Sequence, residues 1–246
     1  MKKTLQKNLV VKASGAFAFV AVLASTWSGL ADTLNPLADT YVQSLSTANN
    51  STSTSLLVKN QFGGANANNR VPFLKFDGSD FLGGNVQSAS LTFTLTSFST
   101  PVNMTFQLFG IPDGATNENF NAATITYANS GITDQSADNN VNDTLMYGGA
   151  PLATASLLST AATGTQITFS GANLISFLDA NTNSYVSFIL TTTTQNSSVF
   201  VGFGSSENTA NEPVLNFTLA PVPEPSTIGL AALGSLGIFA LRRRRE

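Results

Sequence analysis

The chain has 246 residues, only 10% of them charged, and contains neither Cys nor His. These absences exclude disulfides, a thiolate nucleophile and the usual imidazole–carboxylate zinc sites, and they remove the commonest general acid–base residue. Between Asp32 and Pro221, three basic residues stand against twelve acidic ones, a net charge of −9 that disfavours nucleic-acid binding.

The N-terminus has the three-part layout of a secretory signal peptide. Four lysines lie in the first 12 residues, and an uncharged, largely apolar stretch runs from Ala13 to Leu23. Gly29 and Ala31 then stand three and one residues before a plausible cut ahead of Asp32. The pattern predicts a signal peptide over 1–31, read by the general secretion machinery and a signal peptidase; an uncleaved anchor helix is the alternative.

The body, residues 32–221, is dominated by alternation with a period of two. In "SASLTFTLTSF" the residues Ala89, Leu91, Phe93 and Leu95 share one face, and "NMTFQLFG", "YVSFILTTTT", "SVFVGFG" and "PVLNFTL" repeat the pattern. Such strands bury one side and expose the other, as in an antiparallel sandwich. Gly-, Asn- and Pro-rich turns separate them. The sequence therefore predicts one all-β domain, an antiparallel β-sandwich.

One short helix is expected within the body. "SGANLISFLDAN" places Leu174, Ile175 and Leu178 at helical spacing, with Ser170 or Asn173 as the capping residue. With about two turns, the helix suits a lid or crossover on the sandwich.

Carboxylates and hydroxyls are the only groups that the body offers for catalysis. No "GxSxG" elbow is present, and no spacing marks a glycosidase pair among the candidate carboxylates. These are Asp77, Asp80, Asp113, Glu118, Asp143, Glu207 and Glu212. We therefore expect no catalytic residues and no enzymatic activity; a polysaccharide hydrolase or lyase is the least favoured function.

Two loops offer candidate binding residues. "DNNVND" gathers oxygen ligands suited to calcium around Asp138 and Asp143, although it lacks the Gly and Glu of the twelve-residue calcium loop, and a solvated turn is the alternative. Sugars stack on amphipathic aromatic rings, and Tyr147 in "MYGGAP" is the most loop-like tyrosine. The many Phe residues are expected in the core.

The C-terminus, residues 222–246, reads as a sorting signal. Pro223 and Pro225 hold Glu224 in extended backbone, Ile228 to Leu241 form a short apolar run, and a basic end follows. The run predicts a temporary membrane helix, and the stop-transfer residues after it are Arg242, Arg243, Arg244 and Arg245. An ordinary tail anchor is the alternative.

This tail closely resembles the PEP-CTERM sorting signal of Gram-negative bacteria. The resemblance is carried by Pro223-Glu224-Pro225, the apolar run and the arginines, in that order. It implies recognition by an exosortase, a membrane cysteine transpeptidase, and export to a surface layer or an exopolysaccharide matrix.

The body is also similar to DNRLRE domains, which are related to alginate-associated carbohydrate-binding modules. "ADTYV", "RVPFLKFD", "VQSASLTFTL" and "NENFNAATITYAN" follow in the family's order, although the Trp usual before the acidic Glu118 is replaced by Thr116-Asn117. The resemblance implies a jelly-roll-like sandwich, with Asp39 and Glu207 as alternative calcium ligands.

Together these observations predict an exported, non-enzymatic β-sandwich protein of the cell surface or extracellular matrix, processed at its C-terminus. The alternative is a carbohydrate-binding module for a matrix polysaccharide, with calcium as an assisting ion. The two hypotheses differ in one requirement, a saturable affinity for a defined glycan.

Overall fold

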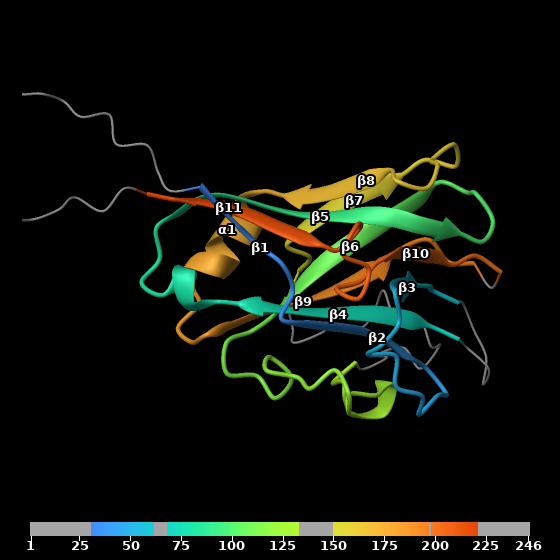
Figure 1. Ribbon diagram of the computed structural model, residues 1–246, viewed down its shortest axis with the longest axis horizontal. Helices are drawn as coiled ribbons and strands as arrows, with labels where there is room; N and C mark the ends of the chain where they lie inside the picture. Colours follow the sequence, from blue (N-terminus) through green and yellow to red (C-terminus); the bar gives the residue numbers. More distant parts are fainter. Residues whose placement is uncertain (1–30, 62–67, 133–149, 197, 221–246) are drawn as a thin grey trace, which may run out of the picture.

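The computed structural model describes residues 31–61, 68–132, 150–196 and 198–220. They form two antiparallel β-sheets packed face to face, with one α-helix (Figure 1). The first sheet has the order β1-β11-β5-β10-β3, with β8 paired to the other side of β5. Its strands are β1 (Ala31–Leu34), β3 (Ser55–Val58), β5 (Val86–Phe98), β8 (Gln166–Ser170), β10 (Val201–Gly204) and β11 (Val214–Leu219).

The second sheet has the order β2-β4-β9-β6-β7. Its strands are β2 (Ala38–Gln43), β4 (Arg70–Asp77), β6 (Met104–Ile111), β7 (Ala153–Leu157) and β9 (Tyr185–Thr192). Two 3₁₀ turns, η1 (Ser79–Phe81) and η2 (Tyr127–Asn129), lie in the connections. The predicted all-β antiparallel sandwich with one short helix is confirmed, whereas the signal peptide and the C-terminal helix lie outside the described residues.

The first sheet follows the predicted alternation. In β5 the side chains of Leu91, Phe93 and Leu95 are buried between the sheets. The intervening hydroxyls lie on the outer face and bond across strands: Thr92 and Thr168 are 3.0 Å apart, and Ser88 and Thr218 are 2.7 Å apart. Burial on one side and hydrogen bonding on the other explain why this sheet could be predicted from period two alone.

Phenylalanines join the two sheets in the main core. The ring of Phe203, on β10, lies 5.6 Å from that of Phe93 on β5 and 5.4 Å from that of Phe106 on β6. The Phe93 ring in turn contacts Phe169 edge to face at 5.8 Å. Such tilted and edge-to-face pairs add to the free energy of apolar burial, so this chain of rings fixes how the sheets stack.

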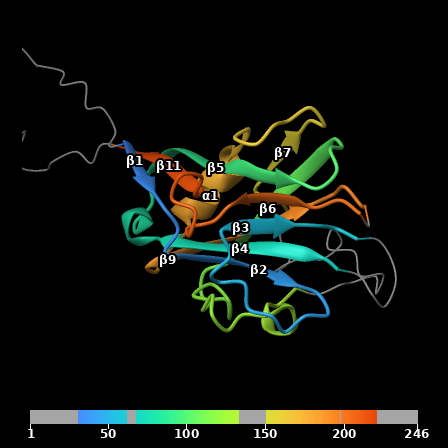
Figure 2. The ribbon, with the colours of Figure 1, turned by 45° about the vertical axis from the view of Figure 1, so that its right-hand side comes forward.

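Whereas its edge strand β7 keeps exposed residues, the second sheet is buried on both faces over β4, β6 and β9, which differs from the expectation of one exposed side. Its outer face carries Phe73, Phe109 and Ile189, and residues 112–132 cover it with Phe120 and Ile125. This covering segment runs beneath β2 and β4 in Figure 2. The rings of Phe73 and Phe120 meet edge to face at 5.7 Å. The segment therefore forms a second apolar layer outside the sandwich.

The helix α1 (Ala172–Asp179) lies where it was expected, but its start differs. Leu174 and Leu178 are buried as their spacing predicts. The N-cap is Gly171, with a φ of 140°, and no side chain caps the helix; Ser170 belongs to β8 instead. Glycine serves here because the sharp strand-to-helix turn needs a positive φ. In the described ranges, no helix has the length and apolar character needed to cross a membrane.

Candidate functional site

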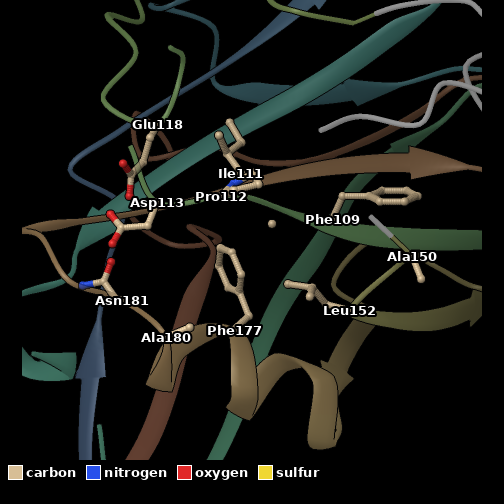
Figure 3. A pocket seen from close by; sticks show the side chains of 11 residues that line it. Phe109, Ile111, Pro112, Asp113, Glu118, Ala150, Leu152, Phe177, Ala180 and Asn181 are labelled. Atoms are coloured by element: carbon tan, nitrogen blue, oxygen red, sulfur yellow. The ribbon is translucent and has the colours of Figure 1, made fainter. Parts of the chain in front are cut away.

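A pocket opens where β6 ends, beside the C-terminal end of α1. It has a volume of about 250 Å³. Figure 3 shows an apolar side and, opposite it, a group of polar side chains. The lining residues are Phe109, Gly110, Ile111, Pro112, Asp113, Glu118, Ala150, Leu152, Phe177, Ala180 and Asn181. An apolar wall with a few convergent polar groups is the usual character of a ligand site.

The apolar wall is built around the ring of Phe177. This residue is half-buried on α1, and its ring centroid lies 5.5 Å from that of the buried Phe188 on β9. On its other side the ring lies against the backbone of Gly110, where any Cβ atom would overlap it. Phe177 is therefore held between a core ring and a glycine, with part of its surface left open to the pocket.

The polar side is built from two carboxylates linked by one amide. Asn183 donates through Nδ2 to Asp113 and to Oε2 of Glu118, the second bond measuring 2.8 Å. The backbone N–H and the hydroxyl of Thr182 also donate to Asp113, the N–H at 2.9 Å. The N–H of Gly114 donates to Glu118 at 2.7 Å. Hydrogen bonds from the loop of Thr182 and Asn183, 65 to 70 residues further along the chain, thus help to place both carboxylates on one side of the pocket.

The loop that supplies these donors is itself fixed to the second sheet. Asn181 donates from Nδ2 to the carbonyl oxygens of Gly78 at 3.1 Å and of Asn183 at 2.5 Å. The side-chain oxygen of Asn183 accepts the N–H of Tyr185 at 2.8 Å, at the start of β9. The hydroxyl of Ser187 donates to the carbonyl of Glu118. The polar side is therefore preorganised before any ligand arrives.

Glu118 is the most enclosed charge of the site, with 5% of its surface exposed. Burial raises the pKa of its carboxyl, and the nearby charge of Asp113 acts in the same direction. The hydrogen bonds from Gly114 and Asn183 oppose this shift because they favour the charged form. A hydrogen bond between the two carboxyl groups raises the pKa of Glu118 as well, so the pair resists carrying two negative charges at once. Among the described residues, the donors to the pair from outside it are neutral groups.

A second, more polar pocket of about 490 Å³ lies around Lys75 on the outer face of the second sheet. The Nζ atom donates to Asn119 Oδ1 and to the Phe120 carbonyl, both at 2.8 Å. It also lies 5.4 Å from the ring centroids of Phe120 and Tyr185. Burial lowers the pKa of Lys75. Through these contacts Lys75 holds residues 112–132 onto the sheet, which gives the side chain a structural role in this pocket.

Asp39 and Glu207 form another carboxylate pair, between β2 and the loop after β10. Asp39 is 2% exposed and accepts the N–H of Ser206 at 2.7 Å and its hydroxyl at 3.1 Å. Burial raises the pKa of Asp39 to about 7, and the charge of Glu207 adds to the shift. Within the described ranges, no group of three or more His, Cys, Asp or Glu residues is placed to hold a metal ion.

The other candidate carboxylates are scattered over the fold. Asp77, at the end of β4, accepts the N–H of Ser79 at 2.9 Å, and these Ser79 hydrogen bonds lower its pKa. Asp80 lies in η1, and Glu212 accepts a hydrogen bond from Asn35 at 2.8 Å. The structure therefore joins Asp113 with Glu118 and Asp39 with Glu207, and leaves these three apart.

Most site residues expected from the sequence cannot be placed. Asp138, Asp143 and Tyr147 lie outside the described residues, as do Pro223, Glu224, Pro225 and the arginines from Arg242 to Arg245. Tyr147 stands three positions before Ala150, which lines the pocket.

The residues that sequence reasoning missed are Phe177 and the Asp113–Glu118 pair. The sequence places Phe177 among the core phenylalanines. Asp113 lies within the turn "IPDG" and Glu118 follows it four residues after Gly114, with no pattern that marks the two as a pair. The spacing of apolar residues in the helix could have identified Phe177 from the sequence. Leu174 and Leu178 already define the buried stripe of a two-turn helix, so a further large apolar residue there needs another contact.

Comparison with known protein families gives two matches. Residues 31–147 match carbohydrate-binding module family 96, and residues 221–245 match the PEP-CTERM protein-sorting motif. The first range includes Asp113 and Glu118, whereas Phe177 lies beyond it. No curated protein matches the chain in sequence. The first match indicates a non-catalytic binding domain with a carbohydrate ligand, and the second indicates export and sorting. Both resemblances drawn from the sequence are confirmed: the C-terminal segment matches the PEP-CTERM sorting motif, and the body is similar over residues 31–147 to a carbohydrate-binding module.

Proposed function

We propose that this is an exported, non-enzymatic glycan-binding protein of the cell surface or exopolysaccharide matrix, and that its sugar site is the pocket beside α1. One observation carries the proposal: a half-buried Phe177 ring and two carboxylates line the same small pocket. The match to a carbohydrate-binding module supports the ligand class. The match to the sorting motif supports the location.

The pocket offers the two kinds of contact that sugars use. The open part of the Phe177 ring is an apolar surface on which the C–H groups of a pyranose can stack. Asp113 and Glu118 accept hydrogen bonds from hydroxyl groups, and hydrogen bonds to a charged acceptor are stronger than neutral ones. Because the ring and the carboxylates are held by core and loop contacts, binding costs little ordering of the protein.

The arrangement of the carboxylates supports binding rather than hydrolysis. A glycosidase places its two carboxyl groups on either side of the scissile bond, as acid and as nucleophile or base. Asp113 and Glu118 instead lie on one side of the pocket (Figure 3). The two carboxylates also share the Nδ2 donor of Asn183. A sugar bound in the pocket would therefore have both carboxylates on the same side. A glycosidic bond would not lie between an acid and a nucleophile or base.

The proposed route of the protein to the cell surface rests on the sequences of its N-terminal and C-terminal segments. We propose that residues 1–31 direct export through the general secretion machinery and are removed by a signal peptidase. The apolar run from Ile228 to Leu241 then holds the precursor in the inner membrane until an exosortase processes it at Pro223-Glu224-Pro225. The arginines at the C-terminus keep the tail on the cytoplasmic side.

A glycan array tests the binding function. The mature protein, recovered from the cell surface, is applied with calcium and with a chelator, beside the Phe177→Ala variant prepared in the same way. We expect saturable binding to a defined set of glycans that is lost in Phe177→Ala and retained in Ser176→Ala, an exposed position on the same helix. Absence of saturable binding to any glycan would favour the alternative, a purely structural matrix protein. Binding that needs calcium would identify the ion as an assisting ligand.

A further inference from the structure

We propose that this protein binds glycans of the same surface that holds its C-terminus, and that it does not bridge this surface to a distant polymer. The inference rests on the proposed function and names the partner, a glycan carried by the attachment surface. It is carried by the position of the pocket, which lies at the end of the sandwich where the last strand stops.

The end of the last strand is joined to α1 through the start of β5. Leu219, the last residue of β11, pairs with Val86. The backbone N–H of Val86 donates to Oδ1 of Asp179, the last residue of α1, at 2.7 Å. The N–H of Ala220 donates to the carbonyl of Asn85, also at 2.7 Å. The chain therefore leaves the sandwich beside the C-terminal end of α1.

The pocket occupies this same end of the sandwich. Ala180 and Asn181, which follow α1 directly, both line it, and so does Ile111 at the end of β6. Asn181 also bonds to the carbonyl of Gly78, in the connection between β4 and β5. Strands β4, β6 and β11 end here, and β5 and β9 begin here. In Figures 1 and 2, the start of β1 and the end of β11 lie at the same end of the molecule as α1.

The segment between the fold and the apolar run of the tail is short. Residues 221–227, seven in all, separate Ala220 from Ile228, and they reach at most about 28 Å when fully extended. Three of the seven are prolines, and proline-rich linkers act as semi-rigid spacers. The other end of the sandwich lies farther away by the length of β5, whose 13 residues span about 40 Å.

This geometry favours a ligand on the attachment surface. A short tether that starts at the pocket end keeps the pocket close to whatever surface holds the tail, and it raises the effective concentration of glycans on that surface. A polymer that approaches from the opposite side meets the end of the sandwich farthest from the pocket. Binding and attachment therefore act toward one surface.

Fluorescence quenching measures the orientation directly, because the chain has no Cys of its own. Ser176→Cys places a dye on α1, and Thr100→Cys places one after β5 at the other end; both positions are exposed. The full chain, produced without an exosortase, is reconstituted into phosphatidylcholine vesicles that carry a quencher on their headgroups. In parallel, the mature chain ending at Pro225 receives a polyhistidine extension and is attached to vesicles containing a nickel-chelating lipid. The matched control carries a Gly–Ser spacer of about twenty residues after Ala220.

We expect the dye on Ser176→Cys to be quenched at least threefold more strongly than the dye on Thr100→Cys, with the difference reduced by the spacer. Equal quenching, or stronger quenching of Thr100→Cys, would overturn the inference. If the full chain does not associate with vesicles while the mature chain shows the expected difference, the membrane-anchoring step of the proposed function fails and the inference stands.

A competition experiment tests the partner. The best glycan of the array is coupled to lipid and placed either in the vesicles that carry the protein or in separate vesicles, and the binding of a soluble fluorescent form is titrated. We expect the apparent affinity for the soluble form to fall at least tenfold when the lipid-linked glycan shares the vesicle. Glycan on separate vesicles should compete only against the spacer variant.

Equal competition from the two vesicle populations against the short-tailed protein would overturn the inference while leaving the proposed function intact. Binding that is unchanged in Phe177→Ala, or no glycan binding at all, would instead overturn the proposed sugar site and with it the named partner. The quenching experiment needs no glycan, so it still decides the orientation in that case.

Discussion

The backbone of Gly110 lies directly against the ring of Phe177, so closely that a Cβ atom on residue 110 would overlap the ring carbon Cε2. Gly110 belongs to β6 and faces the interior side of its sheet, between Leu108 and the end of the strand. Because residue 110 is glycine, the Phe177 ring can pack directly on the backbone of β6 and form one wall of the pocket.

The Gly110→Ala variant should lose glycan affinity by about tenfold or more while remaining folded. The added methyl group forces the half-buried Phe177 ring outward, and such overpacking costs roughly 1–3 kcal/mol of stability. Titration with the best glycan, together with urea denaturation, separates the two effects. The Ser176→Ala variant serves as the control. An unchanged affinity in Gly110→Ala would show that the position of the ring does not matter for binding.

Stability should decrease as the pH rises from about 4 to about 7. Burial raises the pKa of Asp39 from 3.8 to about 7, so in this range the folded state binds a proton that the unfolded state has lost. At about 1.4 kcal/mol per pKa unit, the effect reaches at most about 4 kcal/mol. Glu118, whose pKa is also raised by burial, acts in the same direction. Urea denaturation at pH 4.5, 6 and 8 measures it.

The Asp39→Asn variant isolates the contribution of that residue. An amide still accepts a hydrogen bond from Ser206 but carries no charge, so the variant should be more stable than the wild type at pH 8 and show a smaller pH dependence. Asp80→Asn, at an exposed position in η1, is the matched control. A wild-type stability that rises between pH 5 and 8 would contradict the assignment.

The Phe120→Ala variant should loosen the outer layer without unfolding the sandwich. Phe120 packs against Phe73 outside the second sheet, and truncating a buried phenylalanine costs about 3–5 kcal/mol. Hydrogen exchange should increase in residues 112–132, and glycan affinity should fall because Glu118 lies two residues away. Phe203→Ala, in the main core, provides the contrast, since exchange should then increase throughout both sheets. A global increase in Phe120→Ala would mean that the two layers unfold together.

Replacing Pro223, Glu224 and Pro225 with alanine should leave a membrane-held precursor. The intact mass of the wild-type protein from the cell surface should lack both the signal peptide and the residues beyond the Pro-Glu-Pro region, whereas the variant should retain the four C-terminal arginines. Ser226→Ala with Thr227→Ala is the neighbouring control. A normally matured variant would remove the sorting role of the tripeptide.

The fold could be predicted from the sequence for strands in which the alternation of apolar and polar residues alone determines which side chains are buried. The period of two in β5 correctly placed Leu91, Phe93 and Leu95 in the core. The same reasoning was wrong for β9, where Ile189 is buried on the face expected to be exposed. Its cover comes from residues 112–132, a contact that no local pattern records.

The candidate site was harder to predict for the same physical reason. Asp113 and Glu118 lie five residues apart in a connection, and hydrogen bonds from the distant Asn183 help to bring them together as a pair. Phe177 looked like another core phenylalanine because its open side depends on Gly110, far along the chain. The family resemblances could be read in advance because they depend on the order of motifs rather than on distant contacts.

Strand β1 begins next to the predicted signal-peptide cut and pairs with β11 at the edge of the first sheet. The position of that cut therefore decides whether the edge of β11 stays paired. A cut ahead of Asp32 removes only Ala31 from the pairing and leaves Thr33 and Leu34 opposite Asn216 and Leu215. A cut only a few residues later would remove β1 and bare the hydrogen-bonding edge of β11. An unpaired edge of this kind recruits strands from neighbouring molecules. If the signal peptide is cut ahead of Asp32, as the sequence predicts, the β1–β11 pair stays closed and we expect the mature protein to be protected against aggregation through this edge.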